Sequence, residues 1–96
     1  MTVQEIKEKS TPVFVAYDVA FAGVFGSQAR DEAKNKSDID ILVKFKEPRS
    51  LLDLIALEQE LSGVLKRDVD VVTERALHPF VRERVFNDLR IVYGQR

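Results

Sequence analysis

The stretch that decides the fold spans residues 19–45 and reads VAFAGVFGSQARDEAKNKSDIDILVKF. Its first seven residues, 19–25, are apolar on both alternating faces, which is typical of a central strand covered on each side. Gly26 and Ser27 end this run, a polar connection follows over residues 28–36, and residues 39–45 form the next predicted strand. The segment therefore predicts two strands joined by a compact polar connection.

A helix is predicted before this segment. Residues 3–17 carry Ile6 and Val13 on one side, which is the spacing of an amphipathic helix. Pro12 fits the first turn of a helix, so the stretch could also break there into two helical pieces.

Two helices and two short strands are predicted after the segment. Ser50 and Asp53 form a capping box at the start of a helix whose apolar positions step by three and four: Leu54, Leu57, Leu61, Val64 and Leu65. Residues 69–72 predict a short strand. Residues 77–88 predict a helix with an apolar residue at every fourth position (Val81, Val85 and Leu89), and residues 91–93 a small edge strand. This alternation predicts a single α/β domain over residues 1–96, with a mixed sheet of three to four strands flanked by helices.

Composition excludes several classes of function. A chain of 96 residues holds one small domain and not a two-domain enzyme. The 15 lysines and arginines against 16 acidic residues give a net charge of −1, so we expect no direct binding of nucleic acid. The absence of cysteine and the lone His78 exclude the usual zinc sites. Because no apolar run is long enough to span a membrane and residues 1–10 lack the pattern of a signal peptide, we expect a cytoplasmic protein.

Three aspartates are the candidates for chemistry. Asp38 and Asp40 are two residues apart, so in an extended chain both side chains leave the same face. Asp70 lies on another strand of the same predicted sheet and could complete a cluster of three carboxylates. Hard oxygen ligands at this spacing suit Mg²⁺, or the pair of metal ions that serves phosphoryl transfer.

A phosphate site is predicted beside these carboxylates. Gly26 and Ser27 follow a buried strand, where backbone N–H groups and a hydroxyl can approach phosphate oxygens. Arg30 adds a local positive charge. Each feature alone is typical of an ordinary turn or a solvated strand edge, but their conjunction favours a phosphate cradle beside a metal site.

This conjunction resembles the nucleotidyltransferase superfamily whose best-known member is DNA polymerase β, and within it the minimal nucleotidyltransferases, or MNT domains. The resemblance covers nearly the whole chain and rests on FGSQAR at 25–30, SDIDILV at 37–43 and VDVV at 69–72. Arg30 matches the usual arginine of the family, whereas Asp31 stands where glycine is common.

The resemblance implies a role for each candidate residue. Gly26 and Ser27 would bind the phosphates of the nucleotide, and Asp38 and Asp40 would hold two Mg²⁺ ions. Asp70 would help to bind the catalytic metal and assist deprotonation of the attacking hydroxyl.

The resemblance also implies a biological role. The expected activity is transfer of AMP from ATP to a tyrosine of a partner HEPN-domain toxin, with this chain acting as the antitoxin. Two alternatives stay open: transfer to a small molecule such as an aminoglycoside, and a non-catalytic module that neutralises its partner by contact alone.

Other polar and aromatic residues receive structural interpretations. Asp68 would share a strand face with Asp70, but the family motif falls on Asp70, so we interpret Asp68 as a charge at the strand end. We interpret His78 as a helix cap or surface residue. Three aromatic residues are assigned to the core or to an interface: Phe80, Phe86 and Tyr93.

Overall fold

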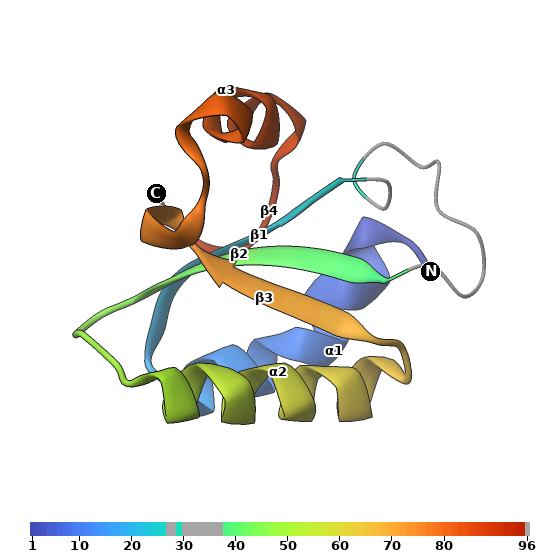
Figure 1. The fold of residues 1–96 in the computed structure, drawn as a ribbon. Helices are drawn as coiled ribbons and strands as arrows, with labels where there is room; N and C mark the ends of the chain where they lie inside the picture. The colour runs from blue at the N-terminus through green and yellow to red at the C-terminus, as the bar shows by residue number, and fades with distance from the viewer. Residues whose placement is uncertain (27–28, 30–37, 96) are drawn as a thin grey trace.

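One mixed sheet organises the chain (Figure 1). The computed structural model describes residues 1–26, 29 and 38–95. Within these residues the chain forms, in order, α1 (Val3–Ala16), β1 (Val19–Phe25), β2 (Ile39–Phe45), α2 (Leu51–Leu65), β3 (Val69–Thr73), the 3₁₀ turn η1 (Glu74–Ala76), α3 (Pro79–Asp88) and β4 (Arg90–Gly94). The predicted α/β order is confirmed, and that the domain spans residues 1–96 stays a prediction.

The sheet has the strand order β3-β2-β1-β4 in the described part of the chain. β1 pairs antiparallel with both β2 and β4, whereas β2 and β3 are parallel and are joined by α2. A parallel pair needs a crossover connection, which α2 supplies. The mixed sheet of three to four strands is thus confirmed, with β1 and β2 as its central strands.

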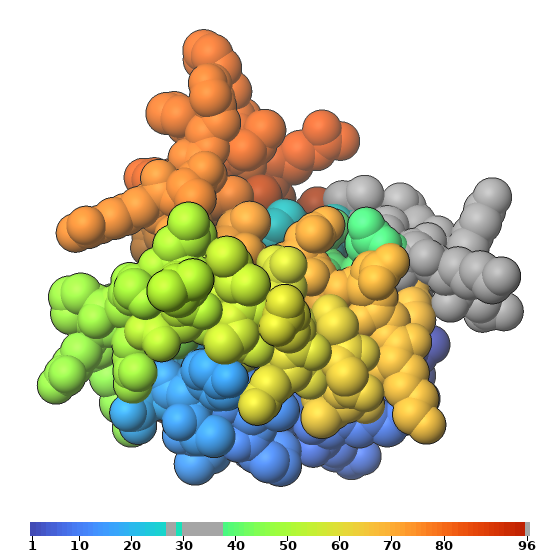
Figure 2. All heavy atoms as spheres, turned by 60° about the horizontal axis from the view of Figure 1, so that its bottom comes forward, coloured from blue at the N-terminus to red at the C-terminus, as the bar shows by residue number. Residues whose placement is uncertain are grey.

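The hydrophobic core lies between one face of the sheet and the helices α1 and α2 (Figure 1). Figure 2 shows these two helices side by side over this face. Alternate strand residues point into the core, as the period of two in a strand requires. The core members are buried residues of α1 (Ile6, Val13, Phe14), α2 (Leu57, Leu61, Leu65), β1 (Val19, Ala22, Val24), β2 (Ile39, Ile41, Val43), β3 (Val69, Val71) and β4 (Val92), together with Ala29.

The opposite face of the sheet is covered in part by α3. Phe21 and Leu42 are buried on this face. Together with Phe86 of α3 they line a hollow of about 290 Å³. Leu89, which ends α3, lies over Gly23, where an added Cβ atom would come within 2.7 Å of the leucine side chain. Both faces of β1 are therefore covered, as its two-sided apolar pattern predicts.

Helix α1 continues through Pro12 as one element, so the possible break into two pieces does not occur. Proline removes one backbone N–H donor from the helix. Its neighbours Val13 and Phe14 are buried against the core, and this burial offsets the missing hydrogen bond. Tyr17, predicted as the last helical residue, is instead the C-cap.

Helix α2 begins at the predicted capping box. The Ser50 side chain accepts a hydrogen bond from the Asp53 backbone N–H, and the Asp53 carboxylate accepts one from the Ser50 backbone N–H. Lys66 ends the helix in the left-handed conformation, with φ of 54°. Of the apolar positions that step by three and four, Val64 is 40% exposed, because the buried stripe follows Leu57, Leu61 and Leu65 at steps of four.

Helix α3 is shorter and more exposed than predicted. It begins at Pro79, after His78, whose ring accepts a hydrogen bond from the Phe80 backbone N–H and so acts as the predicted cap. Of the predicted apolar stripe, Val85 is buried and Val81 is exposed. Phe80 is 91% exposed and so does not belong to the core, whereas its alternative assignment to an interface stays a prediction.

The other two aromatic residues with this assignment, Phe86 and Tyr93, are at least partly buried. Phe86 of α3 is half-buried, and Tyr93 packs against the core, with its ring centroid 5.4 Å from that of Phe14. None of the helices in the described residues is long and apolar enough to cross a membrane.

We expect Leu57→Ala to lower the free energy of unfolding by about 2–5 kcal/mol, because the side chain is fully buried in the core. Urea denaturation followed by circular dichroism would measure this loss. The matched control is Leu52→Ala on the same helix, where the side chain is 76% exposed and the expected change is within about 0.5 kcal/mol. Equal losses in the two variants would contradict the assignment of the core face.

Candidate functional site

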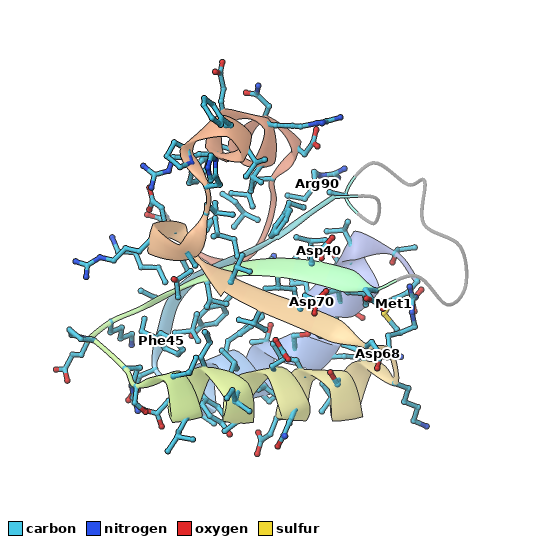
Figure 3. All side chains as sticks on the ribbon, viewed as in Figure 1. Met1, Asp40, Phe45, Asp68, Asp70 and Arg90 are labelled. Atoms are coloured by element: carbon cyan, nitrogen blue, oxygen red, sulfur yellow. The ribbon has the colours of Figure 1, made fainter. Side chains whose placement is uncertain are left out.

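Two aspartates lie side by side on the face of the sheet opposite the core. Asp40 of β2 and Asp70 of β3 are partners in the parallel register, so their side chains leave the same face of adjacent strands (Figure 3). Phe25 at the end of β1 is the register partner of Asp40 on its other side. The structure therefore brings together two of the three predicted carboxylates.

Asp38 is also close enough to act on this pair electrostatically. It is exposed and lies just before β2, and its negative charge acts on both Asp40 and Asp70. Within the described residues, however, no group of three or more acidic or histidine side chains is gathered closely enough to hold a metal ion. Carboxylates of like charge disfavour such close contact with one another.

Gly26 lies directly against Asp40. Its φ of 74° is in the left-handed region, which glycine adopts without steric cost. A Cβ atom at this position would lie 2.5 Å from the Oδ2 atom of Asp40. A side chain at residue 26 would therefore both strain the backbone and displace the Asp40 carboxylate.

The electrostatics of the site are those of crowded negative charges. Burial raises the pKa of Asp40, and the negative charges of Asp70 and Asp38 raise it further. Loss of water around its carboxylate also raises the pKa of Asp70, although this residue is exposed overall. Repulsion from Asp38, Glu58 and Asp68 adds to that rise in the pKa of Asp70. Hard carboxylate oxygens that repel one another are the donor set that a divalent cation such as Mg²⁺ stabilises.

The other predicted phosphate-binding residues, Ser27 and Arg30, lie outside the described residues. Ala29, between them in the motif, is buried in the core cluster. Asp68 precedes β3, is exposed, and its backbone carbonyl accepts a hydrogen bond from the Ile39 N–H at 2.9 Å. These observations agree with its interpretation as a charge at the strand end.

The structure adds two residues near the site that the sequence patterns do not single out. Arg90 begins β4 beside Val24, one residue before the end of β1, and Figure 3 shows it at the same end of the sheet as Asp40. Glu58 of α2 accepts a hydrogen bond from the Val71 backbone N–H, next to Asp70. Neither could be found from local spacing, because each reaches the site only through the sheet order or the packing of a helix.

Relatives with similar sequences are named as protein adenylyltransferases. The chain is 48% identical over 88 residues to a candidate protein adenylyltransferase of Methanocaldococcus jannaschii, which covers 92% of this chain and 95% of that protein. It is 42% identical over 73 residues to the protein adenylyltransferase MntA of Thermococcus cleftensis, covering 76% of this chain and 74% of the relative.

Solved structures share the fold. A structure described as a candidate minimal nucleotidyltransferase has a TM-score of 0.79 and 38% identity, covering 94% of this chain and 95% of the other. A toxin–antitoxin structure with AMP-PNP has a TM-score of 0.81 at 23% identity, covering 94% of this chain and 74% of the other. A tri-AMPylated HEPN toxin of Shewanella oneidensis in complex with its MNT antitoxin has a TM-score of 0.75 at 22% identity, covering 98% and 74%. The last two show similarity of fold alone.

The family model described as polymerase beta, nucleotidyltransferase matches residues 8–96. This match takes in the three segments on which the sequence resemblance rests and all four strands of the sheet. The chain belongs to the polymerase beta nucleotidyltransferase family and is a nucleotidyltransferase.

Proposed function

We propose that this protein transfers AMP from ATP to a hydroxyl of a partner protein, the expected acceptor being a tyrosine of a HEPN toxin, and that it acts in the cytoplasm as an antitoxin. The observation that carries the proposal is the register pairing of Asp40 with Asp70 on the face of the sheet opposite the core. Relatives named protein adenylyltransferases support the reaction class. The MNT–HEPN complex with the same fold suggests the partner.

The donor set fits Mg²⁺. Asp38, Asp40 and Asp70 offer carboxylate oxygens, the ligands that this ion prefers. The pKa values of Asp40 and Asp70 are raised first by burial and then by neighbouring negative charges, which a cation would neutralise. We assign Asp38 and Asp40 to two Mg²⁺ ions, one of which Asp70 would share. When bound, Mg²⁺ would neutralise charge on the phosphates and on the leaving group.

The transfer places few chemical demands on the protein itself. The acceptor oxygen forms a bond to the α-phosphorus of ATP, the bond from that phosphorus to the bridging oxygen breaks, and pyrophosphate leaves. Asp70 is assigned to accept the hydroxyl proton as the new bond forms. Most of the acceleration then comes from positioning and charge neutralisation.

Glycine at residue 26 would serve the phosphates. Its lack of a side chain lets the Asp40 carboxylate lie against the backbone at the end of β1, and the same bare backbone would allow a phosphate oxygen to approach closely. The motif assigns Ser27 and Arg30 to the same task, and both stay predictions. Arg90 at this end of the sheet offers a further positive charge.

We expect Asp40→Asn and Asp70→Asn each to lower nucleotide transfer by about 100-fold or more, because each removes a carboxylate that would bind Mg²⁺. The measurement is incubation with α-labelled ATP and Mg²⁺ in a lysate of the source organism, followed by separation of proteins and small molecules. With the unchanged protein, label should appear on one protein band.

The matched control for this assay is Asp68→Asn, which removes an exposed carboxylate just before β3 and should keep transfer within about threefold. Label found only on small molecules would favour the small-molecule alternative. If neither ATP nor any of the other three nucleoside triphosphates, labelled in the same way, gives transfer, neutralisation by contact alone is favoured.

The Asp40→Asn variant should also be more stable than the unchanged protein at pH 7 without Mg²⁺. Because the pKa of Asp40 is raised in the folded state, its ionised form is disfavoured there, and the folded state loses stability as the pH rises through that pKa. The stability difference should disappear near pH 3, where the carboxyl is protonated in both states. Urea denaturation at the two pH values would measure it, and a variant less stable than the unchanged protein at both would contradict the assigned crowding of charge.

A further inference from the structure

The edge strand β3 is held on its outer side by side chains of α2. The Val69 backbone N–H donates to the Ser62 hydroxyl at 3.2 Å, and the Val71 backbone N–H donates to the Glu58 carboxylate at 2.9 Å. Both acceptor residues are partly buried. These two peptide groups flank Asp70 on either side.

These contacts supply acceptors to backbone donors that an edge strand leaves without a neighbouring strand. The outer edge of a sheet normally presents its N–H groups to water, and its end residues are among the least fixed parts of a sheet. Here the N–H groups of alternate residues face α2, while the intervening Asp70 pairs with Asp40 of β2. The peptides around Asp70 are therefore fixed from both sides, by β2 and by α2.

We propose that Glu58 is a positioning residue for nucleotidyl transfer, whose carboxylate fixes β3 so that Asp70 stays beside Asp40. The proposal rests on the proposed function of Asp70. Glu58 does not touch the reacting atoms in this assignment; it acts through the Val71 peptide. A hydrogen bond to an ionised acceptor is stronger than one between neutral groups, so Glu58 fixes its peptide more firmly than Ser62 fixes that of Val69.

The effect on catalysis follows from geometry. Bound reactants must lie within a few tenths of an ångström of their productive positions, and a displacement of about 1 Å can cost about 100-fold in rate. Loss of the Glu58 bond would free the Val71 peptide, and with it the carboxylate of the preceding residue. Removal of a residue that positions a metal ligand typically lowers activity or metal affinity by about 10- to 100-fold.

Two substitutions separate position from charge. Glu58→Ala removes both the acceptor and the negative charge, whereas Glu58→Gln keeps an acceptor for the Val71 N–H and removes only the charge. The matched control is Glu60→Gln on the same helix, which removes the same charge. The Glu60 side chain accepts a hydrogen bond from Tyr17, and neither the Val69 nor the Val71 contact of β3 depends on it.

The first measurement is amide hydrogen exchange in the protein without nucleotide or metal. Glu58→Ala should speed exchange at Val71 by about tenfold or more, while Glu58→Gln and Glu60→Gln leave it near that of the unchanged protein. The second is steady-state transfer well below the unfolding temperature. Glu58→Ala should lower kcat about tenfold with the KM for ATP within about twofold, and Glu58→Gln should restore kcat to within about threefold of the unchanged protein.

Two results would overturn the inference. One is an unchanged kcat in Glu58→Ala despite faster exchange at Val71, which would make the contact structural only. The other is an equal loss of kcat in the alanine and glutamine variants, which would assign the effect to charge.

A measurement with Mn²⁺ alone, added to the nucleotide-free protein, distinguishes failure of the positioning inference from failure of the proposed function. If the unchanged protein transfers no nucleotide, the proposed function fails. Mn²⁺ should still broaden the NMR amide signals of Asp40 and Asp70 together. This broadening at Asp70 should be weaker in Glu58→Ala than in Glu58→Gln. Equal broadening in the two variants would refute positioning by Glu58 independently of the activity.

Discussion

Parallel pairing of β2 with β3 is the constraint on which the site depends. It sets Asp40 and Asp70 in register on one face, and by the same alternation it sets Ile41 and Val71 in register on the other. The apolar partners are buried in the core that α1 and α2 cover. A shift of one residue would exchange the two faces of a strand, so burial of the valines and isoleucines fixes the position of the carboxylates.

This arrangement lowers the stability of the folded state locally. Partial burial of Asp40 carries a desolvation cost, and the carboxylate of Asp70 on the adjacent strand repels it, both of which raise the pKa of Asp40. The core on the opposite face offsets these costs through the burial of side chains such as Phe14, Leu57 and Leu61. Strain at a functional site that is balanced by packing elsewhere is a general feature of proteins whose sites bind cations or transition states.

The elements that follow from the sequence are those whose signals are local. The two-sided apolar run of β1 and the Ser50–Asp53 capping box were both predictable from local signals. The approach of Asp70 to Asp40 was predicted through the family resemblance, because strand alternation gives the face of a residue but not the neighbouring strand. Signals that depend on tertiary packing were not predictable. Continuation of α1 through Pro12 follows from burial, and the exposure of Phe80 follows from the sparse packing of α3, neither of which a repeat of apolar residues reveals.

The placement of β3 at the sheet edge explains why α2 contributes polar as well as apolar contacts. An edge strand exposes Asp70 on one face and so avoids the full desolvation of a carboxylate in a central strand. The same edge leaves backbone N–H groups without a neighbouring strand, which favours fraying. α2, the crossover between the two parallel strands, packs on the core face of the sheet, and its side chains Glu58 and Ser62 accept hydrogen bonds from the N–H groups of β3. The connection that makes the parallel pair possible thus also stabilises the strand that carries the aspartate.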